Sequence, residues 1–75
     1  MKAYVLISLK TPDERAVLDE LKEMSKIREA HILFGEWDII AKVEGENPED
    51  VATFVIDEIR ALPQVKLTST LIVAR

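Results

Sequence analysis

The feature that most constrains the fold is a helix-start pattern that occurs twice. Residues 11–14 (TPDE) and 47–50 (NPED) each place a capping residue, a proline and acidic residues in the order that opens an α-helix. The two capping residues lie 36 positions apart (47 minus 11), which is close to half of the 75-residue chain. Each pattern follows a strand-like segment and precedes an apolar helical stripe. The sequence therefore predicts two β-α-β halves.

The apolar spacing gives the expected elements. Short β-rich runs predict strands over residues 2–9, 27–34, 37–43 and 64–74. One helix is expected from about 12 to 25, and a second runs from residue 48 until Pro63 stops it. Their apolar stripes are Val17, Leu18, Leu21 and Met24 in the first helix, and Val51, Phe54, Val55, Ile59 and Leu62 in the second.

A tight hairpin joins the two middle strands. Only Gly35 and Glu36 separate the apolar runs, and a two-residue loop with glycine first favours a type II′ turn. This turn sets the register of the two strands. On one face it pairs Phe34 with Trp37, Ile32 with Ile39 and Ala30 with Ala41, and on the other Leu33 with Asp38, His31 with Ile40 and Glu29 with Lys42.

These elements predict an α+β, ferredoxin-like β-α-β-β-α-β sandwich. Right-handed crossovers and the middle hairpin leave few other topologies. The expected sheet is four-stranded and antiparallel, with strand order 4-1-3-2 and both helices on one face. Residues 1–75 are expected to form a single domain.

The sheet face away from the helices is expected to be partly apolar. It should carry Ser8, Asp38, Lys42, Thr68 and Thr70 among larger apolar groups, while Val65, Leu67, Leu71 and Val73 should point toward the helices. Exposed apolar patches on small domains commonly mark interfaces, so we expect two sheets to pack face to face in a dimer. The alternative is a mixed, solvated surface. The expected interface residues are Tyr4, Leu6, His31, Leu33, Ile40 and Ile72.

Composition excludes several classes of function. The chain has 10 basic and 14 acidic residues, a net charge of −4 and no basic run, which argues against binding nucleic acid. It has no cysteine and one histidine, so a metal site is not expected. No apolar run is long enough to span a membrane, and no leader pattern precedes the first strand. We expect a cytoplasmic protein without a cofactor.

No catalytic constellation is evident, although one alternative involves His31. Paired with Asp38 or Asp57, His31 could act as a general base in a small dimeric α/β-barrel enzyme. A lone histidine on a half-apolar sheet face is more often an interface residue. Asp38, directly after Trp37 and beside exposed turn amides, suits a zwitterion, with the carboxylate taking an ammonium group. A purely structural turn flanked by core aromatic residues is the alternative.

Two segments resemble a known family. Residues 34–39 (FGEWDI) are similar to the Gly-x-aromatic-Asp signature in the effector-binding (RAM) domain of the Lrp/AsnC, or feast/famine, transcription regulators. Residues 62–65 (LPQV), followed by Thr68, Ser69 and Thr70, resemble the closing segment of that domain. The resemblance covers essentially the whole chain.

The resemblance implies an amino-acid sensor rather than an enzyme. Family domains form dimers through their sheets and then rings, commonly octamers, and bind amino acids between dimers. By this resemblance Asp38 is the candidate partner of the effector's α-ammonium group. The implied effector pocket is lined by Gly35, Glu36, Trp37 and Asp38, with Thr68, Ser69 and Thr70 as a second segment.

The sequence differs from the usual family regulator in one respect. Such regulators carry a helix-turn-helix before this domain, whereas this sequence opens on the first strand. We expect a stand-alone form that does not contact DNA directly. It would sense amino acids alone or assemble with full-length relatives. A pure interaction domain without a ligand is the remaining alternative.

Overall fold

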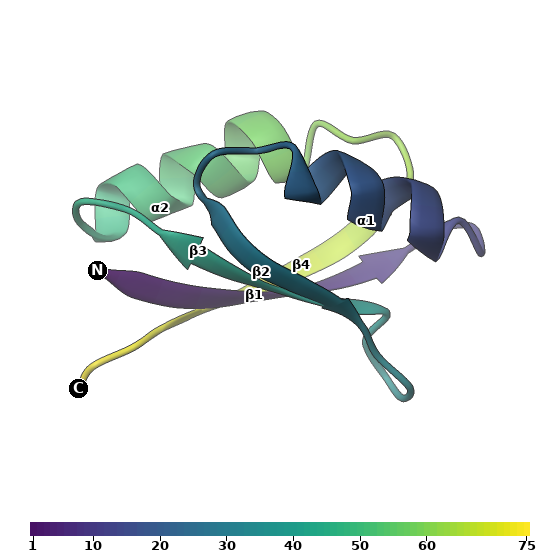
Figure 1. The fold of residues 1–75 in the computed structure, drawn as a ribbon, viewed down its shortest axis with the longest axis horizontal. Coiled ribbons are helices and arrows are strands. Elements are labelled where there is room, and N and C mark those ends of the chain that lie inside the picture. The colour runs from purple at the N-terminus through teal and green to yellow at the C-terminus, as the bar shows by residue number, and fades with distance from the viewer.

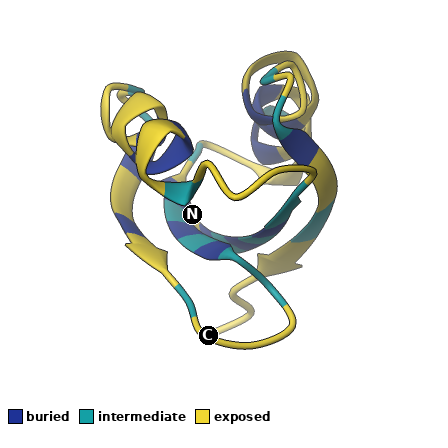
Figure 2. Cartoon of the chain, turned by 90° about the vertical axis from the view of Figure 1, so that its right-hand side faces the viewer, coloured by how far each residue is buried: buried dark blue, intermediate teal, exposed yellow.

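The computed structural model describes residues 1–75, and its helices and strands follow the predicted order. The four strands form one antiparallel sheet in the order β2-β3-β1-β4. Both helices lie on the same side of this sheet (Figures 1 and 2), which confirms the ferredoxin-like fold. The elements are β1 (Lys2–Leu9), α1 (Glu14–Lys22), β2 (Ile27–Ile32), β3 (Ile39–Glu44), α2 (Pro48–Phe54), the π-helical turn η1 (Val55–Ile59) and β4 (Val65–Ile72).

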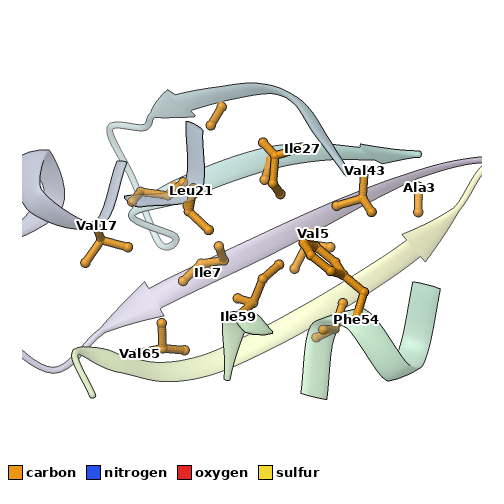
Figure 3. Packing of buried hydrophobic residues seen from close by; sticks show 14 of the residues in the cluster. Ala3, Val5, Ile7, Val17, Leu21, Ile27, Val43, Phe54, Ile59 and Val65 are labelled. Carbon is orange, nitrogen blue, oxygen red and sulfur yellow. The ribbon is translucent and has the colours of Figure 1, made fainter. Parts of the chain in front are cut away.

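The core lies between the helices and the sheet, and all of its buried residues are apolar. Alternate residues of the central strands point into it, so that Ala3, Val5 and Ile7 of β1 are fully buried. Figure 3 shows them gathered with side chains from the helices, including Leu21 and Ile59. The predicted helix stripes are confirmed, because their residues are buried or, for Met24 and Leu62, partly buried against the core.

The second helix begins as the sequence predicts. Asn47 has an extended backbone, and its side-chain oxygen accepts a hydrogen bond from the Asp50 N–H at 2.8 Å. Pro48 takes the first helical position, where the missing N–H is not needed. The helix then widens into η1, in which the Arg60 N–H donates to the carbonyl oxygen of Val55 at 2.8 Å.

Asp50 ties this helix start to the loop before β2. One of its carboxylate oxygens accepts a hydrogen bond from the Glu46 N–H at 2.9 Å and another from Lys26 Nζ at 2.9 Å. The Glu46 hydrogen bond, followed by the bond to Lys26, lowers the pKa of Asp50 below its ordinary value of 3.8. The carboxylate is therefore held in its charged form beside the positive end of the helix dipole.

The first helix begins later and ends earlier than predicted. It starts at Glu14 after the N-cap Asp13, and Asp13 makes no side-chain capping bond. The Asp13 N–H donates instead to the carbonyl oxygen of Thr11 at 2.8 Å. Residues 11–13 form a tight turn, so the predicted Thr11 cap is wrong. The helix ends at Lys22 rather than near Ser25.

The β2–β3 pairing keeps the predicted register within the strands. A bulge at Arg28 precedes the regular part of the ladder. The observed pairs are Glu29 with Lys42, Ala30 with Ala41, His31 with Ile40, and Ile32 with Ile39.

The connection between these strands is longer than the predicted two-residue turn. The last ladder bond runs from the Leu33 N–H to the carbonyl oxygen of Asp38 at 2.8 Å, and the strands end one residue short of it. Gly35 has φ +145°, which fits the expected positive φ. Phe34 is 108% exposed and Trp37 is half buried, so the expected pair of core aromatic residues is wrong. The loop projects away from the helix layer (Figure 1), which leaves nothing to cover Phe34.

A bulge near the start of β4 reverses the predicted faces of that strand. Leu9 pairs with Val65 but Ser8 pairs with Leu67, so Lys66 is an extra residue in the ladder. Directly paired residues of antiparallel strands point to the same face. Leu67, Ser69 and Leu71 therefore share the open face, whereas Thr68, Thr70 and Ile72, which pair with Ile7, Val5 and Ala3, share the helix face. The predicted faces of Leu67, Leu71, Thr68, Thr70 and Ile72 are wrong, because strict alternation from Val65 does not allow for an inserted residue.

Candidate functional site

A small hollow opens where β1, the β2–β3 loop and β4 meet. Its volume is about 280 Å³, and it is lined by Ser8, Glu36, Trp37 and Leu67. Ser8 and Leu67 are direct partners in the β1–β4 ladder, and the loop supplies the other two residues. Ligand pockets occupy roughly 300–1,000 Å³, so this hollow is at the lower limit of that range and has room only for a small metabolite.

Ser8 carries the unsatisfied polar group of the hollow. Its hydroxyl oxygen is buried and has no hydrogen-bond partner. Buried polar groups are normally paired, and leaving one unpaired costs about 1–3 kcal/mol. The sequence placed Ser8 on the open face, but no pattern linked it to the hairpin loop. The hydroxyl oxygen therefore has neither a partner in the chain nor an appreciable accessible surface.

The structure brings two of the predicted effector residues to this hollow. Glu36 and Trp37 line it. Leu67, which the sequence assigned to the helix side, is the β4 residue that lines it because of the bulge. The other predicted effector residues do not line it: Gly35, Asp38, Thr68, Ser69 and Thr70.

Asp38 has a structural partner within the chain. Its Oδ2 accepts a hydrogen bond from the Leu9 N–H at 2.7 Å, and its own N–H donates to the carbonyl oxygen of Ile7 at 2.9 Å. Its carbonyl oxygen also accepts the bond from Leu33 that ends the β2–β3 ladder. Asp38 therefore joins the end of β1 to the hairpin loop.

The sheet face without helices carries a group of apolar side chains. The ladders pair Leu6 with Ile40 and Tyr4 with Leu71, so these side chains are neighbours. Leu67 and Leu71 are 57% and 52% exposed. We call this group the apolar face. Of the predicted interface residues, Tyr4, Leu6, His31 and Ile40 lie on this side of the sheet, whereas Ile72 lies on the helix side. Leu33 directly follows the last residue of β2 and is outside the paired ladder.

Charged groups of β2 and β3 border the apolar face. Lys42 Nζ lies 3.6 Å from one oxygen of Glu29, and His31 Nε2 lies 3.3 Å from the other. The hydrogen bond with His31, followed by the charge of Lys42, lowers the pKa of Glu29 below its ordinary value of 4.5. His31 is exposed, and its partner is Glu29 rather than the Asp38 or Asp57 that the enzyme alternative requires.

Comparison with known proteins identifies the family. Residues 2–75 match the Lrp/AsnC ligand binding domain. The chain belongs to this family. It is 35% identical over 74 residues to an uncharacterised HTH-type transcriptional regulator from Pyrococcus abyssi, a match that covers 93% of this chain and 49% of the relative. This Lrp/AsnC domain therefore spans about half the length of the curated relatives that it matches.

Solved structures agree with this assignment. A hypothetical protein from Pyrococcus horikoshii is 34% identical with a TM-score of 0.90, covering 99% of this chain and 89% of that chain. AsnC from Escherichia coli is 25% identical with a TM-score of 0.92, covering 99% of this chain and 50% of that chain. The shared architecture runs through the whole Lrp/AsnC domain.

The comparisons also indicate the class of function. The relatives are named as transcriptional regulators, and the family is a ligand-binding family rather than a catalytic one. This confirms that the Lrp/AsnC domain is regulatory and not an enzyme. None of its helices has the length and apolar character needed to cross a bilayer. No three histidine or acidic side chains come together as metal ligands would.

Proposed function

We propose that this Lrp/AsnC domain binds an amino acid in the hollow beside the β2–β3 loop and couples binding to self-association. The observation that carries the proposal is the position of the hollow. It lies at one end of the apolar face, and Leu67 belongs to both. A ligand seated against Leu67 changes the surface that a second subunit meets. Binding and assembly are therefore linked through a shared side chain.

The chemistry of the hollow suits an amino acid. The carboxylate of Glu36 can take an ammonium group, and the indole of Trp37 offers an apolar surface beside it. A transcriptional regulator from Neisseria meningitidis that shares the fold, at 18% identity and a TM-score of 0.86, was solved as a complex with L-Met. For this chain, the amino-acid proposal rests on the size and lining of its own hollow.

Self-association uses the apolar face. Two sheets packed face to face around a two-fold axis would cover Leu67 and Leu71, which are otherwise exposed to water. Leu67 and Leu71 replace Ile72 in the proposed interface, and the other members are Tyr4, Leu6, His31, Leu33 and Ile40. Dimers of this kind would assemble further into rings, alone or with full-length regulators, and in this way modulate transcription.

The test is the solution mass measured by size-exclusion light scattering, first without ligand and then with each standard amino acid. We expect a dimer or a larger ring whose mass or melting temperature changes with a subset of the amino acids. A monomer that is indifferent to every amino acid would refute both the sheet-to-sheet dimer and the sensing role.

A further inference from the structure

We infer that His31 makes self-association through the apolar face sensitive to pH. The face associates while the imidazole of His31 is neutral, and protonation of the imidazole in mildly acidic solution opposes association. This regulation rests on the proposed function, because it acts on the interface proposed there. Its physical cause is the net charge that each subunit brings to that interface.

A cluster of three polar side chains joins the apolar face to the edge strand β2. Its centre is Glu29, which has one carboxylate oxygen 3.3 Å from His31 Nε2 and the other 3.6 Å from Lys42 Nζ. The ladders continue from this cluster into the apolar face, because His31 pairs with Ile40 and Lys42 pairs with Tyr4. A second sheet that covers Ile40 and Tyr4 would therefore also lie against the cluster.

Protonation of His31 changes the net charge of this cluster. While the imidazole is neutral, the positive charge of Lys42 and the negative charge of Glu29 cancel. The protonated imidazole adds a positive charge that has no counter-charge of its own, and removing such a charge from water is costly. In a single subunit the His31 side chain is 63% exposed, so that water solvates the charge. Protons therefore bind the single subunit more readily than the dimer, and acid shifts the equilibrium toward the single subunit.

The neighbouring elements supply no further negative charge to His31. Its own strand offers Glu29, which Lys42 of β3 already shares. The carboxylate of Asp38, which precedes β3, is hydrogen-bonded to the backbone of β1. From β1 the same face receives the phenol of Tyr4. Both helices lie on the opposite side of the sheet (Figure 2), so their acidic side chains do not face His31.

His31 is also the group of these strands whose charge changes near neutral pH. It is the single histidine of the chain, and histidine is the side chain that ordinarily titrates between about pH 5 and 8. The hydrogen bond with His31, followed by the charge of Lys42, lowers the pKa of Glu29, so Glu29 stays ionised in this range. The remaining charged residues of β2 and β3, Arg28 and Glu44, lie 4.0 Å apart as a separate ion pair.

The test measures the dissociation constant of self-association by sedimentation velocity at about pH 7 and about pH 5.5. We expect association of the wild type to weaken about tenfold or more at the lower pH, because each dimer contains two copies of His31 and each excluded proton changes the constant by up to about tenfold per pH unit. His31→Gln, which stays neutral, should associate equally at both pH values. His31→Lys, which stays charged, should associate weakly at both.

Controls separate this regulation from acid unfolding and from the proposed function. Asp57→Asn removes an exposed carboxylate from η1 and should keep the wild-type response to pH. Circular dichroism at both pH values verifies that each variant is folded. Equal association of the wild type at both pH values, or an equal response of the wild type and His31→Gln, would overturn the inference and leave the proposed function standing. A wild type that is monomeric even at about pH 7 would remove both.

Discussion

Replacing Asp38 by alanine separates a structural role of this residue from an effector-binding role. The substitution leaves the Leu9 N–H without the carboxylate oxygen that accepts its hydrogen bond at 2.7 Å. The N–H is partly buried and lies at the end of β1, where the bulge in the β1–β4 ladder begins. We therefore expect a loss of stability even when no ligand is present.

The size of this loss follows from the contact. Hydrogen bonds to charged groups contribute about 1.5–3 kcal/mol, and the half-buried position of Asp38 puts the expected cost near the lower end, about 1.5–2 kcal/mol. A chain of 75 residues has a total stability of about 4–11 kcal/mol. For a domain of this size, each kcal/mol lowers the melting temperature by about 4–8 °C. Asp38→Ala should thus melt about 6–16 °C below the wild type.

The assay is thermal and urea unfolding followed by circular dichroism without ligand. Asp38→Asn keeps an oxygen that can accept the Leu9 hydrogen bond, and it should lie between the wild type and Asp38→Ala. Asp19→Ala, which removes an exposed aspartate from α1, should change stability by less than about 0.5 kcal/mol. If Asp38→Ala melts within about 2 °C of the wild type, then the bond to Leu9 does not support the fold and the reasoning is wrong.

Three further predictions concern the apolar face, the Asp50 cluster and the core. Leu67→Glu should yield a monomer in light scattering, whereas Ile56→Glu, at a matched exposure of 58% against 57%, should leave the mass unchanged; equal behaviour of the two would argue against the interface. The pKa of Asp50 is lowered in the folded chain, so its charged carboxylate adds to the free energy of unfolding. This contribution is fully present at pH values above the ordinary pKa of 3.8, and it is lost as the pH falls through the lower pKa of the folded chain. As the pH is lowered, the free energy of unfolding of Asp50→Asn should therefore fall less than that of the wild type. An equal fall in the two proteins would contradict this assignment. Leu21→Ala, at a fully buried core position, should cost about 2–5 kcal/mol in urea unfolding, and a loss below about 1 kcal/mol would show that Leu21 is not tightly packed.

Much of the fold could be predicted because its signals are local. Helix stripes repeat every 3.6 residues and strand faces every 2, so burial of one face is encoded in neighbouring residues. The Asn47 cap, the Val51 stripe and the pairing of Ile32 with Ile39 all follow from such patterns and are confirmed. The sheet order then follows from the few ways in which these elements connect.

The candidate site was only partly predictable. Glu36 and Trp37 stand in a short recognisable segment, and the structure brings both to the hollow. Ser8 and Leu67 lie 59 positions apart (67 minus 8), and no sequence pattern relates them. Their meeting depends on the β1–β4 ladder, which forms only in the folded chain.

By itself, the sequence determined the order of the elements, their apolar faces and the position of the hairpin loop, since these depend on residues close together in the chain. Only the tertiary structure decided which face Leu67 presents and where the Asp38 carboxylate finds its partner. The bulge at Lys66 inverts the last strand, and the Leu9 N–H takes the Asp38 oxygen that a ligand was expected to use. Both outcomes depend on pairing with β1, a strand distant in sequence, whose unpaired backbone groups exist only once the sheet has formed.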